Sequence, residues 1–213
     1  MSAPILPDPV QPDASRPVLC LASASPRRRD LLASIGVSVE VRPVAVDETP
    51  LPGEKAMSYV SRLARDKALA GASLSPLPTL GSDTAVVCDG EILGKPEGAE
   101  HAAAMLRRLA GRAHEVLTAV AVSGPAGVQE ACVATRVTMR EITDAEIAAY
   151  WASGEPADKA GGYAIQGLAA IFVEHIEGSH SAVVGLPLYE TAELLRRQGV
   201  ALWGGALGPA PSA

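Results

Sequence analysis

The stretch "VLCLASASPRRRDLLASIG", residues 18–36, specifies the fold class because it encodes a strand, a tight turn and a helix in direct succession. Its first five residues form a short apolar run, which is typical of a buried strand. Ser25 is a suitable helix N-cap, Pro26 suits the first helical position, and Gly36 stands where a glycine commonly ends a helix. This succession predicts an α/β protein.

Arg27, Arg28 and Arg29 occupy the first turn of the predicted helix, where basic side chains oppose the helix dipole. One interpretation is that they are solvated surface charges on an ordinary helix. The other is that the turn binds an anion, because free backbone N–H groups, serine hydroxyls and guanidinium groups would then converge on one phosphate. The residues alone leave both interpretations open.

The rest of the chain continues to alternate between strand and helix patterns. Asp89-Gly90 is a strong hairpin turn signal, and Thr143 with Glu146 forms a capping box that opens a helix. The apolar patterns predict strands at 37–41, 114–122, 128–140 and 168–176, helices at 55–70, 97–110 and 187–198, and loops at 154–167 and 177–187. We therefore expect one α/β unit, a mixed β-sheet flanked by helices with two lobes around a cleft.

The charge balance of the chain limits its partners. The 213 residues include 18 Lys or Arg and 24 Asp or Glu, which gives a net charge of −6. Such a chain repels polyanions, so we expect no nucleic acid partner, and a bound anion must be held by a local basic cluster. No apolar run is long enough to predict a membrane span.

Cysteine usage and the two ends of the chain complete this picture. Three widely spaced cysteines without a C-x-x-C pattern argue against a disulfide framework or a zinc site and fit a reducing cytosol, so we expect a cytoplasmic protein. Residues 1–17 are rich in proline and lack a signal-peptide pattern, which predicts a disordered leader. We expect a single domain at 18–203 and a flexible tail at 204–213.

The segment "LGSDTAVV" interrupts a valine-rich strand with Ser82, Asp83 and Thr84. An isolated Asp near a strand end is usually a turn or cap residue. Polar residues within an apolar strand, however, indicate a cleft, where Asp83 could act as a general base on water or bind a hard cation.

Three other positions have an ordinary structural interpretation beside a functional one. Glu48 lies in a predicted loop and is by default a solvated charge. Lys67 stands among apolar residues of a predicted helix, so it either extends along the surface or reaches into a cleft. Gln166 lies in a glycine-rich loop that could be a plain connector, although its amide could also read the edge of a base.

Eight segments in order along the chain carry a family resemblance. They are "LASASPRRRDLL", "VDET", "YVSRLARDKALA", "LGSDTAVV", "GEILGKP", "AAAMLRRLAGRAHEVLTAVAV", "EPADKAGGYAIQG" and "IEGSHSAVVGLPLYET". Together they span about residues 18–200 and resemble the successive motifs of the Maf proteins, which are nucleoside triphosphate pyrophosphatases. A match of eight ordered motifs over this range is far more specific than any single motif.

The resemblance implies an elongated mixed sheet similar to the inosine triphosphate pyrophosphatase fold, and hydrolysis of a nucleoside triphosphate to the monophosphate and pyrophosphate. It implies a divalent cation, Mg²⁺ or Mn²⁺, and we further expect that a homodimer could form. Asp83 matches the proton acceptor of the family. The other matching positions are Arg27, Thr84 and Gln166 for base selection, Ser23, Arg28, Lys67 and Lys95 for phosphate binding, and Glu48 with Asp83 for the metal.

The loop "DKAGGYAIQG" resembles the branch of the family that hydrolyses dTTP and UTP, whereas the 7-methyl-GTP branch typically has Glu in place of Gln166. Gly162, Ala164, His180 and Ala182 depart from the usual pattern of the branch. The resemblance leaves two alternatives, the 7-methyl-GTP activity of the sister branch and a nucleotide-binding regulator of septum formation. The cellular role that the resemblance implies is removal of modified nucleotides or arrest of cell division.

Overall fold

The computed structural model describes residues 16–203 and 206–207 and contains one mixed β-sheet with helices on both faces. The strand order is β2-β1-β3-β5-β6-β7, and β4 pairs with β3 beside this path. β1 runs parallel to β2 and β3, and the other pairs are antiparallel. The strands are β1 (Leu19–Leu21), β2 (Val39–Val41), β3 (Thr79–Cys88), β4 (Glu91–Leu93), β5 (Ala113–Gly124), β6 (Gly127–Met139) and β7 (Val173–Glu177).

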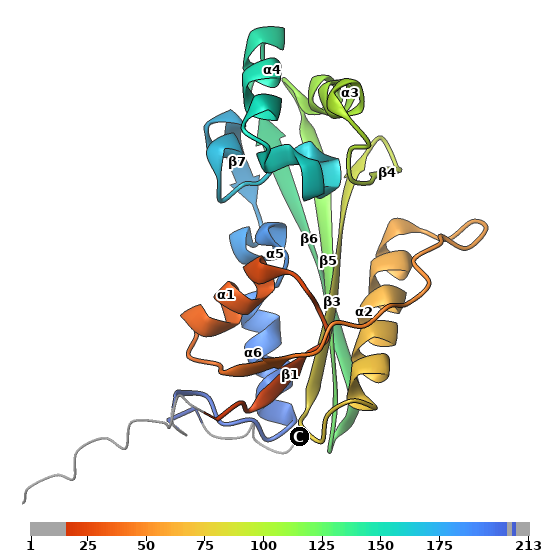
Figure 1. Ribbon diagram of the computed structural model, residues 1–213, viewed down its shortest axis with the longest axis vertical. Helices are drawn as coiled ribbons and strands as arrows, with labels where there is room; N and C mark the ends of the chain where they lie inside the picture. The colour runs from red at the N-terminus through yellow and green to blue at the C-terminus, as the bar shows by residue number, and fades with distance from the viewer. Residues whose placement is uncertain (1–15, 204–205, 208–213) are drawn as a thin grey trace, which may run out of the picture.

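The helices cover the sheet unevenly (Figure 1). They are α1 (Pro26–Ser34), α2 (Ala56–Ala72), α3 (Ala99–Leu109), α4 (Asp144–Ala152), α5 (His180–Val184) and α6 (Leu188–Arg197), with short 3₁₀ helices η1 (Glu155–Asp158), η2 (Ala160–Gly162) and η3 (Leu168–Phe172). The helix α2 packs along β3 and β5 on one face, and α6 packs on β5 and β6. The helices α3 and α4 lie together at the far end of the long strands (Figure 1).

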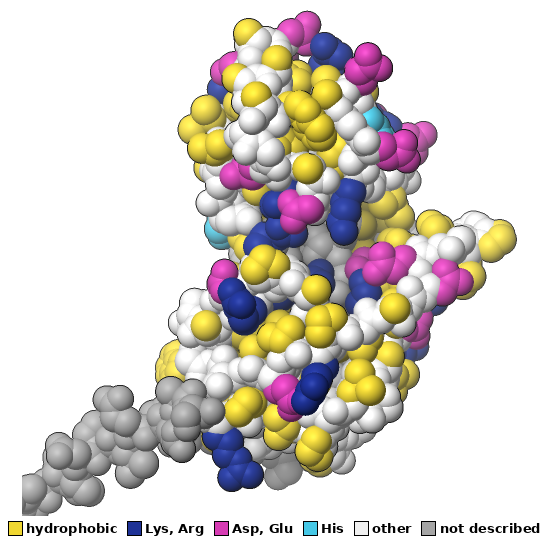
Figure 2. All heavy atoms as spheres, viewed as in Figure 1, with side chains coloured by type: hydrophobic (Ala, Val, Ile, Leu, Met, Phe, Trp, Pro, Cys, Tyr) yellow, Lys and Arg dark blue, Asp and Glu magenta, His cyan; other side chains and the backbone are white. Residues whose placement is uncertain are grey.

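The core is divided into separate apolar clusters, and this division produces two lobes. One cluster joins α3, α4 and the 3₁₀ segments to one end of the long strands and includes Leu106, Ile147 and Phe172. Another joins β1, α1 and α6 at the other end and includes Leu19 and Leu195. A third cluster packs α2 against β3 and β5 and includes Val60 and Leu117. Because these clusters follow one another along an extended sheet, the molecule is elongated, with a waist between the lobes (Figure 2).

The sheet has a gap in one edge at this waist. On this edge of β3, pairing with β1 ends at Leu80 and pairing with β4 starts at Val86. Among the described residues, the stretch 81–85 of β3 therefore has a strand partner only in β5. A short β1 and a short β4 thus leave the middle of β3 open to the cleft, and this middle contains Asp83.

The helix α2 approaches β3 closely at Gly81. A Cβ atom there would lie 2.3 Å from the Ala64 carbonyl oxygen and 2.5 Å from the Ala68 nitrogen. No side chain fits in this space, so glycine permits helix and strand to touch. The close contact places Lys67, on the same face of α2, beside Asp83.

The local signals of the sequence agree with most of these elements. Ser25 occupies the N-cap position of α1, although its side chain makes no capping hydrogen bond. Gly36 follows α1 with a φ of +72°, and the capping box of Thr143 and Glu146 opens α4. Asp89 and Gly90 both have positive φ, as a two-residue hairpin of this kind requires. The α/β class and the mixed, helix-flanked sheet are confirmed.

Two predictions of secondary structure were wrong. Residues 168–172 form the 3₁₀ helix η3, and the predicted strand begins only at Val173. The predicted loop at 177–187 contains the helix α5, whose first turn is capped by the Ser179 hydroxyl. Short apolar runs do not distinguish a strand from a turn of helix, and local hydrogen bonds decided both cases.

The predicted leader and tail fall mostly outside the described residues. Residues 1–15 of the leader, and 204–205 and 208–213 of the tail, are not described; within the tail, Leu207 pairs with Leu202 in an isolated bridge. None of the helices in the described part of the chain combines the length and hydropathy needed to cross a bilayer.

Candidate active site

A cavity of about 640 Å³ lies at the waist, beside the open edge of β3. Residues of both lobes line it, from α1 and β3 to the loop that carries Gln166. Figure 2 shows Lys and Arg side chains gathered around this hollow. The cavity brings together residues that are more than 140 positions apart in the sequence.

The cavity is locally basic although the whole chain is acidic. Its charged lining consists of five basic and three acidic side chains, namely Arg27, Arg28, Lys67, Lys95 and Lys159 with Glu48, Asp83 and Asp158. The net charge of the chain is −6. A concave surface with an excess of positive charge concentrates small anions even on an acidic protein.

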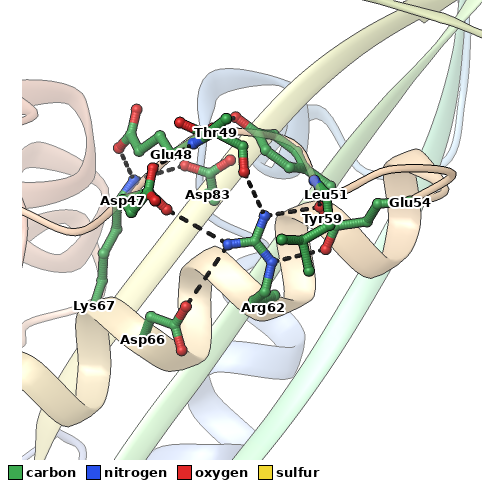
Figure 3. Close-up of polar contacts among 10 residues, drawn as sticks. All are labelled: Asp47, Glu48, Thr49, Leu51, Glu54, Tyr59, Arg62, Asp66, Lys67 and Asp83. Atoms are coloured by element: carbon green, nitrogen blue, oxygen red, sulfur yellow. Dashed lines mark hydrogen bonds and ion pairs between the residues drawn. The ribbon is translucent and has the colours of Figure 1, made fainter.

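Lys67 connects two carboxylates at the centre of the cavity (Figure 3). Its Nζ lies 2.7 Å from Asp83 Oδ1 and 2.7 Å from Glu48 Oε1. The Lys67 side chain is 11% exposed, so it reaches into the cleft and does not extend along the surface. Of the two positions that the sequence allowed for Lys67, on the surface or in a cleft, the contact of α2 with β3 selects the cleft.

The surroundings of these two carboxylates shift their pKa values in opposite directions. Burial raises the pKa of Asp83, although the charges of Lys67 and Arg28 oppose the shift. The hydrogen bond from Lys67 lowers the pKa of the more exposed Glu48. A carboxylate with a raised pKa has a higher affinity for a proton, which suits Asp83 better than Glu48 to accept one from water.

Arg28 crosses from α1 to the other side of the cavity. Its guanidinium group donates to the Gly185 carbonyl oxygen at 2.9 Å, to Ser23 Oγ at 3.1 Å and to Thr84 Oγ1 at 3.5 Å. Within residues 16–203 it has no carboxylate within 4 Å, and burial lowers its pKa. An Arg at a cavity wall with only neutral hydrogen-bond partners is suited to bind an anion.

The three arginines of α1 have different surroundings. Arg27 lines the cavity and pairs with Asp158 Oδ2 at 3.4 Å, and Asp158 also bonds to Lys159. Arg29 points away and bonds to the neighbouring Asp30, as a solvated charge would. Arg27 and Arg28 therefore line the cavity, whereas Arg29 does not.

The remaining predicted residues line the same cavity. Ser23 binds Arg28, and Thr84 accepts a hydrogen bond from Thr118 at 3.1 Å. Lys95, after β4, and Gln166 both have exposed side chains at the rim. All the predicted site residues are therefore brought together in one cavity.

A model of the family described as "Maf-like protein" matches residues 18–198. The chain belongs to the Maf family. It is 54% identical over 179 residues to a dTTP/UTP pyrophosphatase of Escherichia coli O157:H7, covering 83% of this chain and 91% of that protein. It is 54% identical over 184 residues to a dTTP/UTP pyrophosphatase of Methylococcus capsulatus, covering 85% and 91%.

A solved structure from Mycobacterium abscessus, described as a nucleoside-triphosphatase / dITP/XTP pyrophosphatase, is also similar to this Maf-family chain. The two are 20% identical and overlap with a TM-score of 0.38 over 58% of this chain and 74% of that chain.

The donor atoms in the cavity fit a hard divalent cation. Glu48 and Asp83 both approach the Lys67 ammonium, so their oxygens already converge on one positive charge. Within the described residues no group of three or more His, Cys, Asp or Glu is placed to hold a metal ion. Two carboxylates fit Mg²⁺ or Mn²⁺, which in nucleotide enzymes commonly take one or two protein ligands and complete their coordination with water and substrate phosphates.

Sequence reasoning missed several residues that support this Maf-family site. Tyr150 accepts a hydrogen bond from the Ala164 nitrogen at 3.1 Å and donates one to Glu155 at 2.7 Å. The Glu155 carboxylate also accepts from the Leu168 nitrogen at 3.1 Å, so both flanks of Gln166 are braced. Glu155 stands in the quoted motif "EPADKAGGYAIQG", but the motif alone carries no signal that its side chain faces inward.

Proposed function

We propose that this chain hydrolyses dTTP and UTP, together with modified pyrimidine nucleotides, to the nucleoside monophosphate and pyrophosphate. The proposal is supported by relatives at 54% identity that are named dTTP/UTP pyrophosphatase. The observation that carries it is the placement of Asp83 and Glu48 on Lys67 in a cavity with five basic side chains.

In the proposed reaction the basic residues hold the triphosphate. A nucleoside triphosphate carries about four negative charges near neutral pH, and phosphoryl transfer is catalysed mainly by positioning and charge stabilisation. Arg28 and Lys95, with the hydroxyl of Ser23, are proposed to bind the phosphates. Lys67 is proposed to pair with the phosphate oxygens nearest to Asp83.

Asp83 is the proposed proton acceptor. It would orient a water molecule and take its proton as the water oxygen attacks the α-phosphorus. The bond between the α-phosphorus and the oxygen that bridges to the β-phosphorus then breaks, and pyrophosphate leaves with the bonding electrons. A divalent cation held by Glu48 and Asp83 would neutralise charge on the phosphate oxygens.

Gln166 is proposed to select the base with Arg27 and Thr84. The side-chain amide offers both a donor and an acceptor, which complements the donor and acceptor edge of a pyrimidine. A glutamate at this position would lose the donors. This is the physical basis for preferring the dTTP and UTP activity to the 7-methyl-GTP activity.

A panel of nucleotides tests the proposal. The purified protein is incubated with dTTP, UTP, 7-methyl-GTP and dATP and with Mg²⁺ or Mn²⁺, and monophosphate and pyrophosphate are measured. We expect dTTP and UTP to be the fastest substrates and Asp83→Asn to fold normally with nearly all turnover lost. A preference for 7-methyl-GTP would favour the sister branch, and nucleotide binding without any product would favour the regulator of septum formation.

The biological setting belongs to the same proposal. An enzyme of this specificity would prevent incorporation of modified nucleotides and could also contribute to division arrest. We place it in the cytoplasm, where its substrates are, and a homodimer can be tested by sedimentation of the purified chain.

A further inference from the structure

Arg62 of α2 attaches the loop that carries Glu48 to the helix (Figure 3). Its Nε and Nη2 lie 2.7 Å from the two oxygens of Glu54, which is a bidentate pair. The same guanidinium group donates to the Asp47 carbonyl oxygen at 3.4 Å and to the Thr49 carbonyl oxygen at 3.2 Å. One side chain therefore binds the loop at its start, at its middle and at its end.

Tyr59, one turn earlier on α2, binds the Glu48 carbonyl oxygen, which lies between the two carbonyl groups that Arg62 binds. Its hydroxyl donates to the Glu48 carbonyl oxygen at 3.0 Å, and the Arg62 guanidinium lies over its ring at 5.6 Å. The carbonyl oxygens of three consecutive residues, 47–49, are thus bound by two stacked side chains of one helix. This arrangement determines where the Glu48 backbone lies.

The Glu48 side chain depends on this backbone support. It is 59% exposed, and the described contacts of its carboxylate are with Lys67 alone. A carboxylate on an unsupported loop would be free to leave the cavity, whereas the bound carbonyl oxygens keep it above Asp83 (Figure 3).

The ion pair between Arg62 and Glu54 persists across the neutral pH range. The hydrogen bonds from Arg62, followed by the bond from the Leu51 backbone N–H, lower the pKa of Glu54 to about 2. Glu54 therefore stays ionised throughout the neutral range, and the pair does not open by titration. The guanidinium group is needed because three of its nitrogens donate to the carboxylate and to two carbonyl oxygens at once, and a lysine ammonium lacks this fixed fork of donors.

We propose that Arg62 is a positioning residue that fixes loop 47–54 on α2, holds the Glu48 carboxylate beside Asp83, and thereby sets the affinity of the site for a divalent cation. This inference rests on the proposed function in treating Glu48 as a metal ligand. Arg62 itself touches no reacting atom and acts through Glu48.

Binding of Mn²⁺ alone, measured by electron paramagnetic resonance or calorimetry on the whole chain, tests this inference without turnover. We expect Arg62→Gln to weaken Mn²⁺ binding about tenfold, in the range seen when groups that orient metal ligands are removed. Arg62→Lys should recover little of this loss, and Tyr59→Phe should weaken binding in the same direction by less. Arg65→Gln removes the same charge from α2 but breaks only the pair with Glu130, so it should bind Mn²⁺ like the unmodified chain.

A double-mutant cycle separates positioning from a general structural effect. If Arg62 acts through Glu48, Arg62→Gln should change the Mn²⁺ dissociation constant less than twofold in a Glu48→Gln background. In dTTP hydrolysis, Arg62→Gln should raise the Mn²⁺ concentration for half-maximal rate by the same factor as the dissociation constant.

Three results would overturn the inference: no Mn²⁺ binding by the unmodified chain, an unchanged constant in Arg62→Gln, or equal factors in both backgrounds. Failure of the proposed function looks different. In that case none of the four nucleotides is hydrolysed, while the Mn²⁺ cycle still shows the coupling between Arg62 and Glu48.

Discussion

His114 is the residue whose burial has the clearest consequence for stability. It is 4% exposed in β5, its Nε2 lies 2.8 Å from the Tyr163 hydroxyl, and the two rings pack edge to face. Its Nδ1 has no hydrogen-bond partner among the described residues. Burial lowers the pKa of His114 to about 4, so the ring is neutral in the folded protein near pH 7.

The sign of the pH effect follows from this lowered pKa. Between pH 6.5 and pH 4 the unfolded chain binds a proton at His114 and the folded chain does not, so stability falls as the pH falls. At about 1.4 kcal/mol per tenfold change in proton affinity, the loss reaches about 3 kcal/mol near pH 4. Urea unfolding of the unmodified chain and of His114→Gln at pH 7 and pH 4 measures it. We expect the variant to lose about 3 kcal/mol less, and parallel pH profiles would contradict the assignment.

At the scale of elements, the segment from η1 to η3 carries Gln166 on a braced loop. Glu155 at the start of η1 receives hydrogen bonds from Tyr150 of α4 and from the backbone of η3. A Cβ atom on Gly167 would lie 2.1 Å from Glu155 Oε2, so the loop also needs glycine to approach this carboxylate. The position of Gln166 is therefore set by residues that line no part of the cavity.

Replacing Glu155 by Gln tests this dependence. The amide keeps the volume but has one acceptor oxygen where the carboxylate uses two, so a bond to the loop is lost. We expect the ratio of kcat/KM for dTTP to that for dATP to fall about fivefold, since one lost hydrogen bond corresponds to roughly 1 kcal/mol. Mn²⁺ binding should not change, because Glu48 and Asp83 are untouched. Glu174→Gln, an exposed position on β7, is the charge-matched control; an unchanged ratio in Glu155→Gln would show that the loop holds its shape without this brace.

At the scale of the whole molecule, the cavity is the place where the two lobes meet. Arg28 of α1 contacts Ser23 beside it, Thr84 of the sheet and the Gly185 carbonyl oxygen after α5. A ligand in the cavity would touch Arg28 on one side and the Gln166 loop on the other. Ligand binding should therefore stabilise the molecule as a whole.

A non-hydrolysable α,β-imido analogue of UTP with Mg²⁺ measures this linkage by thermal unfolding. At a hundredfold excess over its dissociation constant a ligand adds about 2.7 kcal/mol, which raises the Tm of a chain of this length by roughly 5 °C or more. We expect the rise to persist in Arg29→Ala and to be largely lost in Arg28→Ala, although both variants remove one charge from α1. Equal rises in the two variants would contradict the proposed role of Arg28.

Much of this molecule was predictable from short-range signals. The start of α1 at Pro26, the turn at Asp89-Gly90 and the capping box at Thr143 depend on residues within a few positions of one another, so the sequence indicates them directly. The order of motifs was sufficient to indicate the family, and with it the residues that gather in the cavity. The 3₁₀ helix at 168–172 and the helix α5 were missed because their local patterns are ambiguous.

The long-range geometry required the folded chain. The gap in β3 at 81–85 arises because two short strands pair on either side of it, and neither strand indicates where the other ends. Whether Lys67 faced solvent or the cleft depended on how closely α2 packs at Gly81. The amino-acid sequence thus specified the elements and the chemistry of the side chains, because propensities, caps and turns act over a few residues. Their convergence at the waist, and the hold of Arg62 on the Glu48 loop, arose from packing between distant segments, because contact distances and burial exist only once those segments meet.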